Sequence, residues 1–178
     1  MFTATQRGIA GEELFSAVVT LTSNGNLELF KPLVDDDHTD ITAGERGKVP
    51  ALAIQVKTAL SLDDQGFAVA KMYFPDSEQP REHPAFVYAV IYVVDASIET
   101  AWIVPSADFN RLAYRGKGPH GKGMELEFMA SPSRSDKWAA FRCGRLDLGR
   151  RLIESIDSLP PGPPPRIAGT RLLIAPAR

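Results

Sequence analysis

The sequence is poor in the residues that build disulfide frameworks and zinc sites. It contains one cysteine, Cys143, in 178 residues, which excludes a disulfide framework and a cysteine-rich zinc site. Its three histidines stand far apart, at positions 38, 83 and 120, without the spacing of zinc ligands. Zinc-based chemistry of the usual kinds is therefore excluded.

Long apolar runs are also missing. The longest, residues 85–94, stops at Asp95 and is too short to span a bilayer. No basic patch followed by an apolar stretch opens the sequence, so we expect no signal peptide and a cytoplasmic location. Hydrophobic residues make up 44% and charged residues 24%, which is ordinary for a globular protein and excludes disorder throughout. The length predicts one domain, or one domain and a tail.

The formal net charge of −2 hides an uneven distribution of charge along the chain. Residues 1–110 carry 7 Lys or Arg against 16 Asp or Glu, a net of −9, whereas residues 111–151 carry 10 against 4, a net of +6. In one interpretation, the acidic N-terminal part supplies a cation site and the basic segment supplies a surface for a polyanion. The other is two solvated faces of one domain, and charge alone leaves both open.

The hydrophobic pattern predicts one helix, then a run of strands, then a second helix, which is an α+β order. The first helix is expected over residues 8–21, with one apolar face made of Ala10, Leu14, Ala17, Val18 and Leu21. The later helix is expected within residues 137–156, with an apolar side of Leu146, Leu148, Leu152, Ile153 and Ile156. Strands are expected over residues 27–34, 39–43, 51–59, 67–74, 85–94 and 101–104, with a buried helix as the alternative for 85–94. Residues 111–123 are expected to form a basic, glycine-rich loop.

The C-terminus has the composition of a linker and tail. Residues 160–165 read Pro-Pro-Gly-Pro-Pro-Pro, which favours polyproline II. We therefore expect a domain over residues 1–158 and a tail over 159–178. The apolar residues of the tail, Leu172, Leu173 and Ile174, are expected to be buried, and a homodimer is expected from the frequency of two-fold assemblies.

Four polar residues stand out in order along the chain. Glu12 follows two glycines at the start of the first helix, Asp40 lies in a short strand, and Gln55 and Lys57 lie in the clearest strand. The two-residue period puts Gln55 and Lys57 on one face, where they are costly to bury without partners such as Glu12 and Asp40. Taken singly, each residue has an ordinary explanation: an exposed strand face, a turn acid, or a first-turn helix acid. Only their joint order favours a site.

Together, Arg7-Gly8, Gly11-Glu12, Asp40-Ile41 and Gln55-Val56-Lys57-Thr58 resemble the motifs of the PD-(D/E)xK phosphodiesterase superfamily. The resemblance covers about residues 6–110 and is nearest to the bacterial endonuclease-like branch with a Gln-x-Lys motif. It implies a restriction-endonuclease-like α+β fold, with a central mixed β-sheet flanked by helices.

The resemblance also implies roles for these residues. Asp40 would be a ligand of Mg²⁺ or Mn²⁺, Gln55 would replace a second acidic ligand, and Lys57 would position or activate the attacking water. Glu12 would complete the metal site, with Glu13 as its rival on the same helix; Asp35, Asp36 and Asp37 could compete with Asp40. Because an amide brings no charge, metal binding would depend on Glu12 and Asp40.

These roles imply a metal-dependent nuclease-like protein that hydrolyses phosphodiester bonds of a nucleic acid, DNA rather than RNA. Backbone phosphates would be held by Arg111, Arg115, Lys117 and Lys122. A second basic group, Arg142, Arg145, Arg150 and Arg151, would either join them or form a solvated helix face. The alternative function is a catalytically decayed nuclease fold that serves as a nucleic-acid-binding or protein-interaction module. A purely structural dimerisation domain is the third class.

Overall fold

The computed structural model describes residues 3–32, 38–48 and 51–160. Its α-helices are α1 (Ala4–Thr22), α2 (Ser106–Leu112) and α3 (Leu148–Asp157). Its strands are β1 (Leu27–Phe30), β2 (Ile41–Glu45), β3 (Ala51–Ala59), β4 (Ala68–Phe74), β5 (Phe86–Val94), β6 (Ser97–Pro105), β7 (Tyr114–Lys117), β8 (Met124–Ala130) and β9 (Arg142–Gly144). None of the helices in these ranges is long and apolar enough to cross a membrane.

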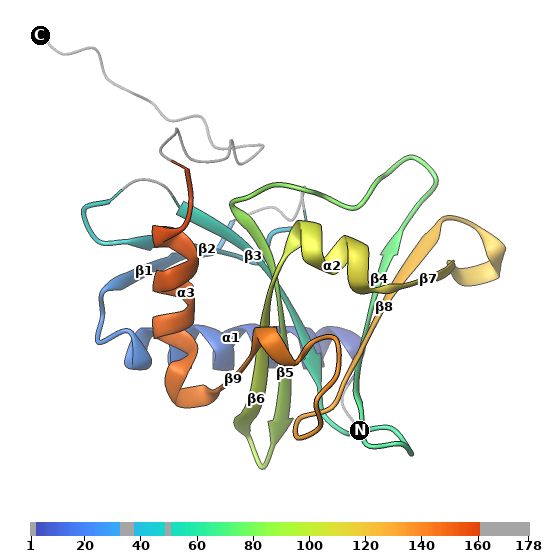
Figure 1. Ribbon diagram of the computed structural model, residues 1–178, viewed down its shortest axis with the longest axis horizontal. Coiled ribbons are helices and arrows are strands. Elements are labelled where there is room, and N and C mark those ends of the chain that lie inside the picture. Colours follow the sequence, from blue (N-terminus) through green and yellow to red (C-terminus); the bar gives the residue numbers. More distant parts are fainter. Residues whose placement is uncertain (1–2, 33–37, 49–50, 161–178) are drawn as a thin grey trace, which may run out of the picture.

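Six strands form a mixed sheet in the order β1-β2-β3-β5-β6-β9 (Figure 1). Only β3 and β5 run parallel, and the other neighbours are antiparallel. A parallel pair needs a crossover connection, and here the chain leaves the sheet after β3 to form β4. That strand joins a second, antiparallel sheet of three strands in the order β4-β8-β7.

The central strand β3 separates two hydrophobic cores. Leu52, Ile54 and Val56 face one core with α1 and α3, whereas Ala53 and Ala59 face the other core with the second sheet and α2. The alternation of strand side chains produces this division. The expected α+β class with a central mixed sheet is therefore confirmed. The difference is that a second sheet, and not helices alone, covers one of its faces.

Helix α1 packs through a stripe that matches its apolar pattern only in part, since Leu14 and Val18 of that pattern lie partly buried against the core. The stripe consists of Gly11, Phe15 and Val19, while Leu21 is 75% exposed and Ala10 and Ala17 are also exposed. A β-carbon at position 11 would lie 1.8 Å from Oγ1 of Thr58 in β3. A glycine therefore marks the closest contact of the helix with the sheet, and an apolar pattern does not count glycine.

Several other expectations were wrong in their details. Strand β2 runs over Ile41–Glu45 instead of 39–43, so Gly44 and Glu45 continue the strand as partners of Glu28 and Leu27. The expected basic loop over residues 111–123 contains the end of α2 and strand β7, and α2, β7 and β8 were not predicted. In the later helix, Leu148, Leu152 and Ile156 are buried as expected, but Leu146 is 77% exposed. The strand expected over residues 27–34 is observed over Leu27–Phe30, and positions 33 and 34 lie outside the described residues. The tail residues that were expected to be buried also lie outside the described residues.

The contact at Gly11 gives the first testable prediction. Gly11→Ala should lower the free energy of unfolding by about 1–3 kcal/mol, because the added methyl group meets Thr58. Gly8→Ala is the matched control on the same helix: nothing lies within 4 Å of its β-carbon position. Gly8→Ala should raise the free energy of unfolding by about 0.5–1 kcal/mol, because alanine has a higher helix propensity than glycine. Urea unfolding of both variants measures the difference, and equal stabilisation by the two alanines would contradict the close contact.

Candidate functional site

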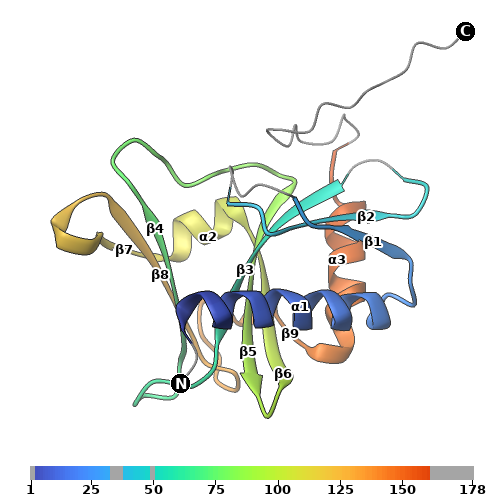
Figure 2. The same cartoon turned by 180° about the vertical axis from the view of Figure 1, so that it is seen from behind.

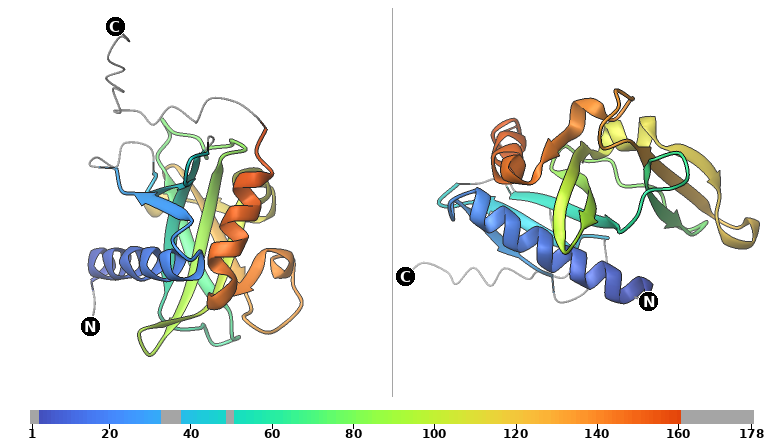
Figure 3. Two further views of the ribbon diagram at one scale, coloured as in Figure 1. Left: turned by 90° about the vertical axis from the view of Figure 1, so that its left-hand side faces the viewer. Right: turned by 90° about the horizontal axis from the view of Figure 1, so that it is seen from below.

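The first half of α1, the end of β3 and the strand β4 enclose a cavity of about 630 Å³. Figures 2 and 3 show the N-terminal end of α1 and the second sheet at the same end of the molecule. Polar side chains that line the cavity include Arg7, Glu12, Asp40, Lys57, Thr58 and Lys71. Three of the four residues that the sequence singles out, Glu12, Asp40 and Lys57, therefore reach one cavity from three separate segments.

Asp40 is held at the point where β2 begins to pair with β3. Its backbone N–H donates to the carbonyl oxygen of Ile54 at 3.0 Å, and its Oδ2 accepts the backbone N–H of Val56 at 2.6 Å. Strand pairing starts only at Ile41 opposite Ile54, so the carboxylate serves the next donor of β3 beyond the ladder. A buried backbone donor needs such a partner, and this bond fixes the Asp40 side chain beside Lys57.

Glu12 follows the close contact at Gly11, and its side chain is 26% exposed. Lys31 lies between the two candidate acids, with its Nζ 3.6 Å from Oε2 of Glu12 and 2.6 Å from Oε1 of Glu13. Glu13 lines a different, mainly apolar cavity of about 610 Å³. Of the two rivals, Glu12 is the one that shares a cavity with Asp40 and Lys57.

Lys57 is partly buried in the wall of this cavity. Its ammonium makes no hydrogen bond or ion pair with any residue that the structure describes. Lys71, across the cavity, is different, because its hydrogen bonds to Glu125 and Glu127 raise its pKa. Lys57 therefore keeps its three donors available for an anion in the cavity.

Gln55 points to the same face of β3 as Lys57 but is not among the residues that line the cavity. It is 5% exposed and lies in register with Tyr88 of β5. Its Oε1 atom is buried and has no hydrogen-bond partner among the described residues. Burying an amide oxygen without a partner is costly, so this acceptor calls for a partner that the described residues do not supply.

Glu12 and Asp40, the two carboxylates of the cavity, fit the metal that the sequence implies, whereas Gln55 lies behind the cavity lining. Two carboxylates and an amide oxygen are hard oxygen ligands, and Mg²⁺ commonly takes one or two carboxylates with waters and substrate phosphates. Within the described ranges there is no group of three or more His, Cys, Asp or Glu side chains placed to hold a metal. The competing acids Asp35, Asp36 and Asp37 lie outside the described residues.

The predicted phosphate contacts lie apart from the cavity. Arg111 ends α2, and Arg115 and Lys117 belong to β7, whose hairpin with β8 projects from one end of the molecule (Figures 1 and 2). All four predicted residues are exposed, including Lys122 in the hairpin loop. Arg111 pairs with Asp108 at 2.6 Å and Arg115 donates to the carbonyl oxygen of Asn110 at 3.0 Å. The two lysines have no ion pair in the described part of the chain.

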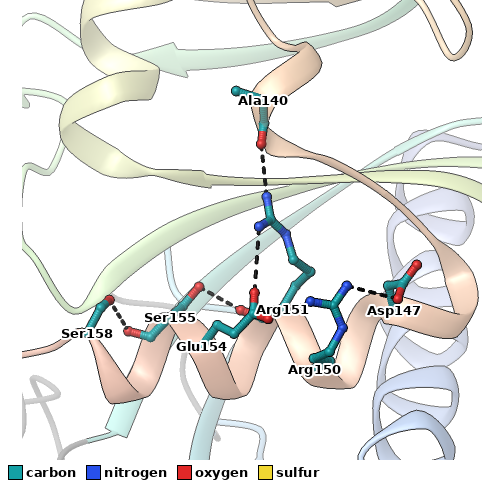
Figure 4. A network of polar contacts seen from close by, with 7 residues as sticks. All are labelled: Ala140, Asp147, Arg150, Arg151, Glu154, Ser155 and Ser158. Carbon is teal, nitrogen blue, oxygen red and sulfur yellow. Dashed lines mark hydrogen bonds and ion pairs between the residues drawn. The ribbon is translucent and has the colours of Figure 1, made fainter.

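The second basic group is engaged in contacts within the fold (Figure 4). Arg150 binds Asp147 and Glu154, and these hydrogen bonds raise its pKa. Arg151 donates to the carbonyl oxygen of Ala140 at 2.9 Å. Arg142 donates to two backbone carbonyl oxygens, and Arg145 donates to Ser97. The interpretation as a solvated helix face, joined to neighbouring loops, is the one that these contacts favour.

Two cations near the site escaped the sequence analysis. Lys31 contacts Glu12, and Arg81 donates to Oγ1 of Thr39, the residue before Asp40, at 3.3 Å. Both side chains reach the site from connecting segments, where no periodic pattern marks them.

Comparison with solved structures supports the same fold. A bacterial homing endonuclease, I-Ssp6803I, superposes with a TM-score of 0.54 and covers 87% of this chain and 95% of its own. The two sequences are 14% identical, so the likeness concerns the fold, which is restriction-endonuclease-like. No protein-family model and no curated protein matches the chain.

Substitutions at Asp40 should separate its structural role from any role of its charge. Asp40→Ala should lower the free energy of unfolding by about 1–3 kcal/mol, because it leaves the Val56 N–H without this acceptor. Asp40→Asn keeps an oxygen acceptor and should cost about 1 kcal/mol or less. Urea unfolding without divalent cations measures both changes. Equal stability of the alanine variant and the wild type would show that the hydrogen bond contributes nothing.

Proposed function

We propose that the protein is a metal-dependent nuclease that hydrolyses phosphodiester bonds of DNA. The observation that carries the proposal is the meeting of Glu12, Asp40 and Lys57 in one cavity. These are a pair of carboxylates and the ammonium of a partly buried lysine that has no ion pair among the described residues, which are groups that suit phosphodiester hydrolysis. The nuclease-like fold that the chain shares with a homing endonuclease supports this proposal.

Each residue has a distinct task in this proposal. Glu12 and Asp40 would hold Mg²⁺ or Mn²⁺ through their carboxylates, and Gln55 would add its amide oxygen. The bound ion supplies polarisation of the phosphate and a lowered pKa of bound water. Lys57 places its positive charge where negative charge develops on the phosphate. Asp40 is already oriented for its task by the N–H of Val56.

The projecting β7–β8 hairpin supports DNA as the substrate. Its exposed cations, Arg115, Lys117 and Lys122, suit contacts with backbone phosphates, joined by Arg111 at the end of α2. A two-stranded ribbon fits the major groove of B-form DNA, whereas the major groove of A-form RNA is too narrow for side chains to read. Cleavage of both strands would use two copies of the site, and the homodimer stays a prediction.

A second function is favoured by two specific observations. The site has an amide at Gln55 in place of an acid, and Glu12 is paired with Lys31. Both features weaken the attraction for a divalent cation. They favour a catalytically decayed fold that binds nucleic acid or a protein without cleaving.

Nicking of supercoiled plasmid DNA distinguishes the two functions. With Mg²⁺ or Mn²⁺, we expect the wild type to nick the plasmid and Lys57→Met and Asp40→Asn to lose at least about 100-fold in rate. Lys48→Met is the matched control, because Lys48 is exposed and pairs with Glu45 and Asp157. Equal rates for the wild type and all three variants would show a contaminating nuclease, and the decayed fold would then be the better description.

Gln55→Glu tests the predicted metal ligand without a cleavage assay. In EDTA, the new buried carboxylate should lower the melting temperature, since Glu12 and Asp40 carry the same charge. Added Mn²⁺ should raise the melting temperature of this variant more than that of the wild type, because a third carboxylate strengthens metal binding. Glu127→Gln serves as a control for acid–amide exchange outside the cavity. If Mn²⁺ raises the melting temperatures of the wild type and of Gln55→Glu equally, Gln55 does not face the metal.

A further inference from the structure

Arg81 lies on the same face of the main sheet as Gln55 and Lys57. Its guanidinium carbon is 4.9 Å from the centre of the Phe86 ring, and its Nη1 donates to Oγ1 of Thr39 at 3.3 Å. Phe86 is the register partner of Ala53 in β3. Ala53, Gln55 and Lys57 lie on one face of that strand. Arg81 therefore stands beside the Ala53 end of this row.

The loop that carries Arg81 is pinned to α2. Nδ2 of Asn110 donates to the carbonyl oxygen of Arg81 at 3.0 Å. Two residues further on, the backbone of His83 makes two hydrogen bonds with Oγ of Ser106, each 2.9 Å long. Ser106 and Asn110 are 0% and 5% exposed. These buried polar residues of a short helix hold the loop in place, and Arg81 is therefore preorganised.

The charge of Arg81 has no carboxylate partner within the described residues. Arg46 and Arg111 pair with Glu28 and Asp108, whereas Arg115, Arg142 and Arg145 bind carbonyl or hydroxyl oxygens instead. The field of Arg81 reaches Tyr88, the register partner of Gln55: burial raises the pKa of Tyr88 to about 12, and the charge of Arg81 opposes that rise. A partly buried cation without a carboxylate partner among the described residues thus lies close enough to influence Tyr88, the neighbour of Gln55.

Spacing places Arg81 beside the reacting centre and not within it. Residues two apart in a strand are about 7 Å from each other. Arg81 stands over the level of Ala53, which is two such steps from Lys57, and it does not line the cavity with Asp40 and Lys57. Thr39, its hydrogen-bond partner, directly precedes Asp40.

We propose that Arg81 forms a phosphate subsite, which holds a backbone phosphate of the same nucleic acid near the one acted on at Asp40 and Lys57. This inference rests on the proposed function. A guanidinium group has five N–H donors in a fork that matches two phosphate oxygens. The bond to Thr39 uses one of these donors, and stacking on Phe86 fixes the plane of the group.

Duplex binding and steady-state cleavage together test the subsite. Binding of a fluorescent 20-base-pair duplex is measured by anisotropy with Ca²⁺ in place of Mg²⁺, at several salt concentrations. Arg81→Met should weaken binding about tenfold or more and reduce the slope of log K against log salt by about one. In cleavage, Arg81→Met should raise KM with kcat nearly unchanged, whereas Lys57→Met should lower kcat with binding retained.

Two further variants keep the test decisive. Arg46→Met removes an exposed arginine at the opposite end of β2 and should change neither binding nor slope. Arg81→Lys keeps the charge and the stacking but loses the fork, so it should weaken binding without changing the slope. If Arg81→Met fails to fold, this lysine variant carries the test.

The outcomes separate the subsite from the nuclease function. The subsite is overturned if Arg81→Met leaves both the affinity and the salt slope unchanged. It is also overturned if Arg81→Lys leaves the affinity unchanged. A loss of kcat with unchanged KM overturns it as well, because Arg81 would then act at the reacting centre. A wild type that binds the duplex without cleaving it with any metal overturns the nuclease, while the binding data still decide on the subsite. A wild type that binds no duplex overturns both.

Discussion

The architecture of the candidate site depends on how closely α1 approaches β3. At Gly11 the helix backbone reaches the Thr58 side chain so closely that no β-carbon fits between them. The next residue, Glu12, is thereby brought to the end of β3, where Lys57 emerges one residue before Thr58. A helix held one side chain further from the sheet would carry the carboxylate away from the lysine. The buried residues Phe15 and Val19 extend the same stripe and hold the helix in this orientation.

The second constraint is the end of the β2–β3 ladder. β3 continues beyond the last pair with β2, so its next backbone donor, the N–H of Val56, lacks a strand partner on that side. The carboxylate of Asp40 takes this donor, and the cavity opens beside it. Strand pairing and the lining of the cavity thus share one residue. The backbone requires an acceptor there, and an acidic acceptor also brings a carboxylate to the cavity wall.

The sequence predicted the parts of this site that follow local rules. β3 has a clear two-residue period, which places Gln55 and Lys57 on one face, and the order of Glu12 and Asp40 suggested their meeting. It predicted the buried face of α1 only in part, at Leu14 and Val18, and missed the closest contact because glycine carries no hydrophobic signal. It missed β7 because all four of its residues are exposed, which leaves no alternation to detect. Arg81 was missed because its position depends on Asn110 and Thr39, which are distant in the chain.

The amide at position 55 has a physical consequence for the metal-free protein. Three carboxylates around one cavity would repel one another without a cation, and each would lose part of its hydration. With Gln55 neutral, the repulsion is limited to Glu12 and Asp40, and Lys31 already offsets the charge of Glu12. The orphaned oxygen of Gln55 costs less than a buried charge would. The neutral amide therefore limits charge repulsion among these residues, and in the proposed function substrate phosphates would supply part of the negative charge that holds the ion.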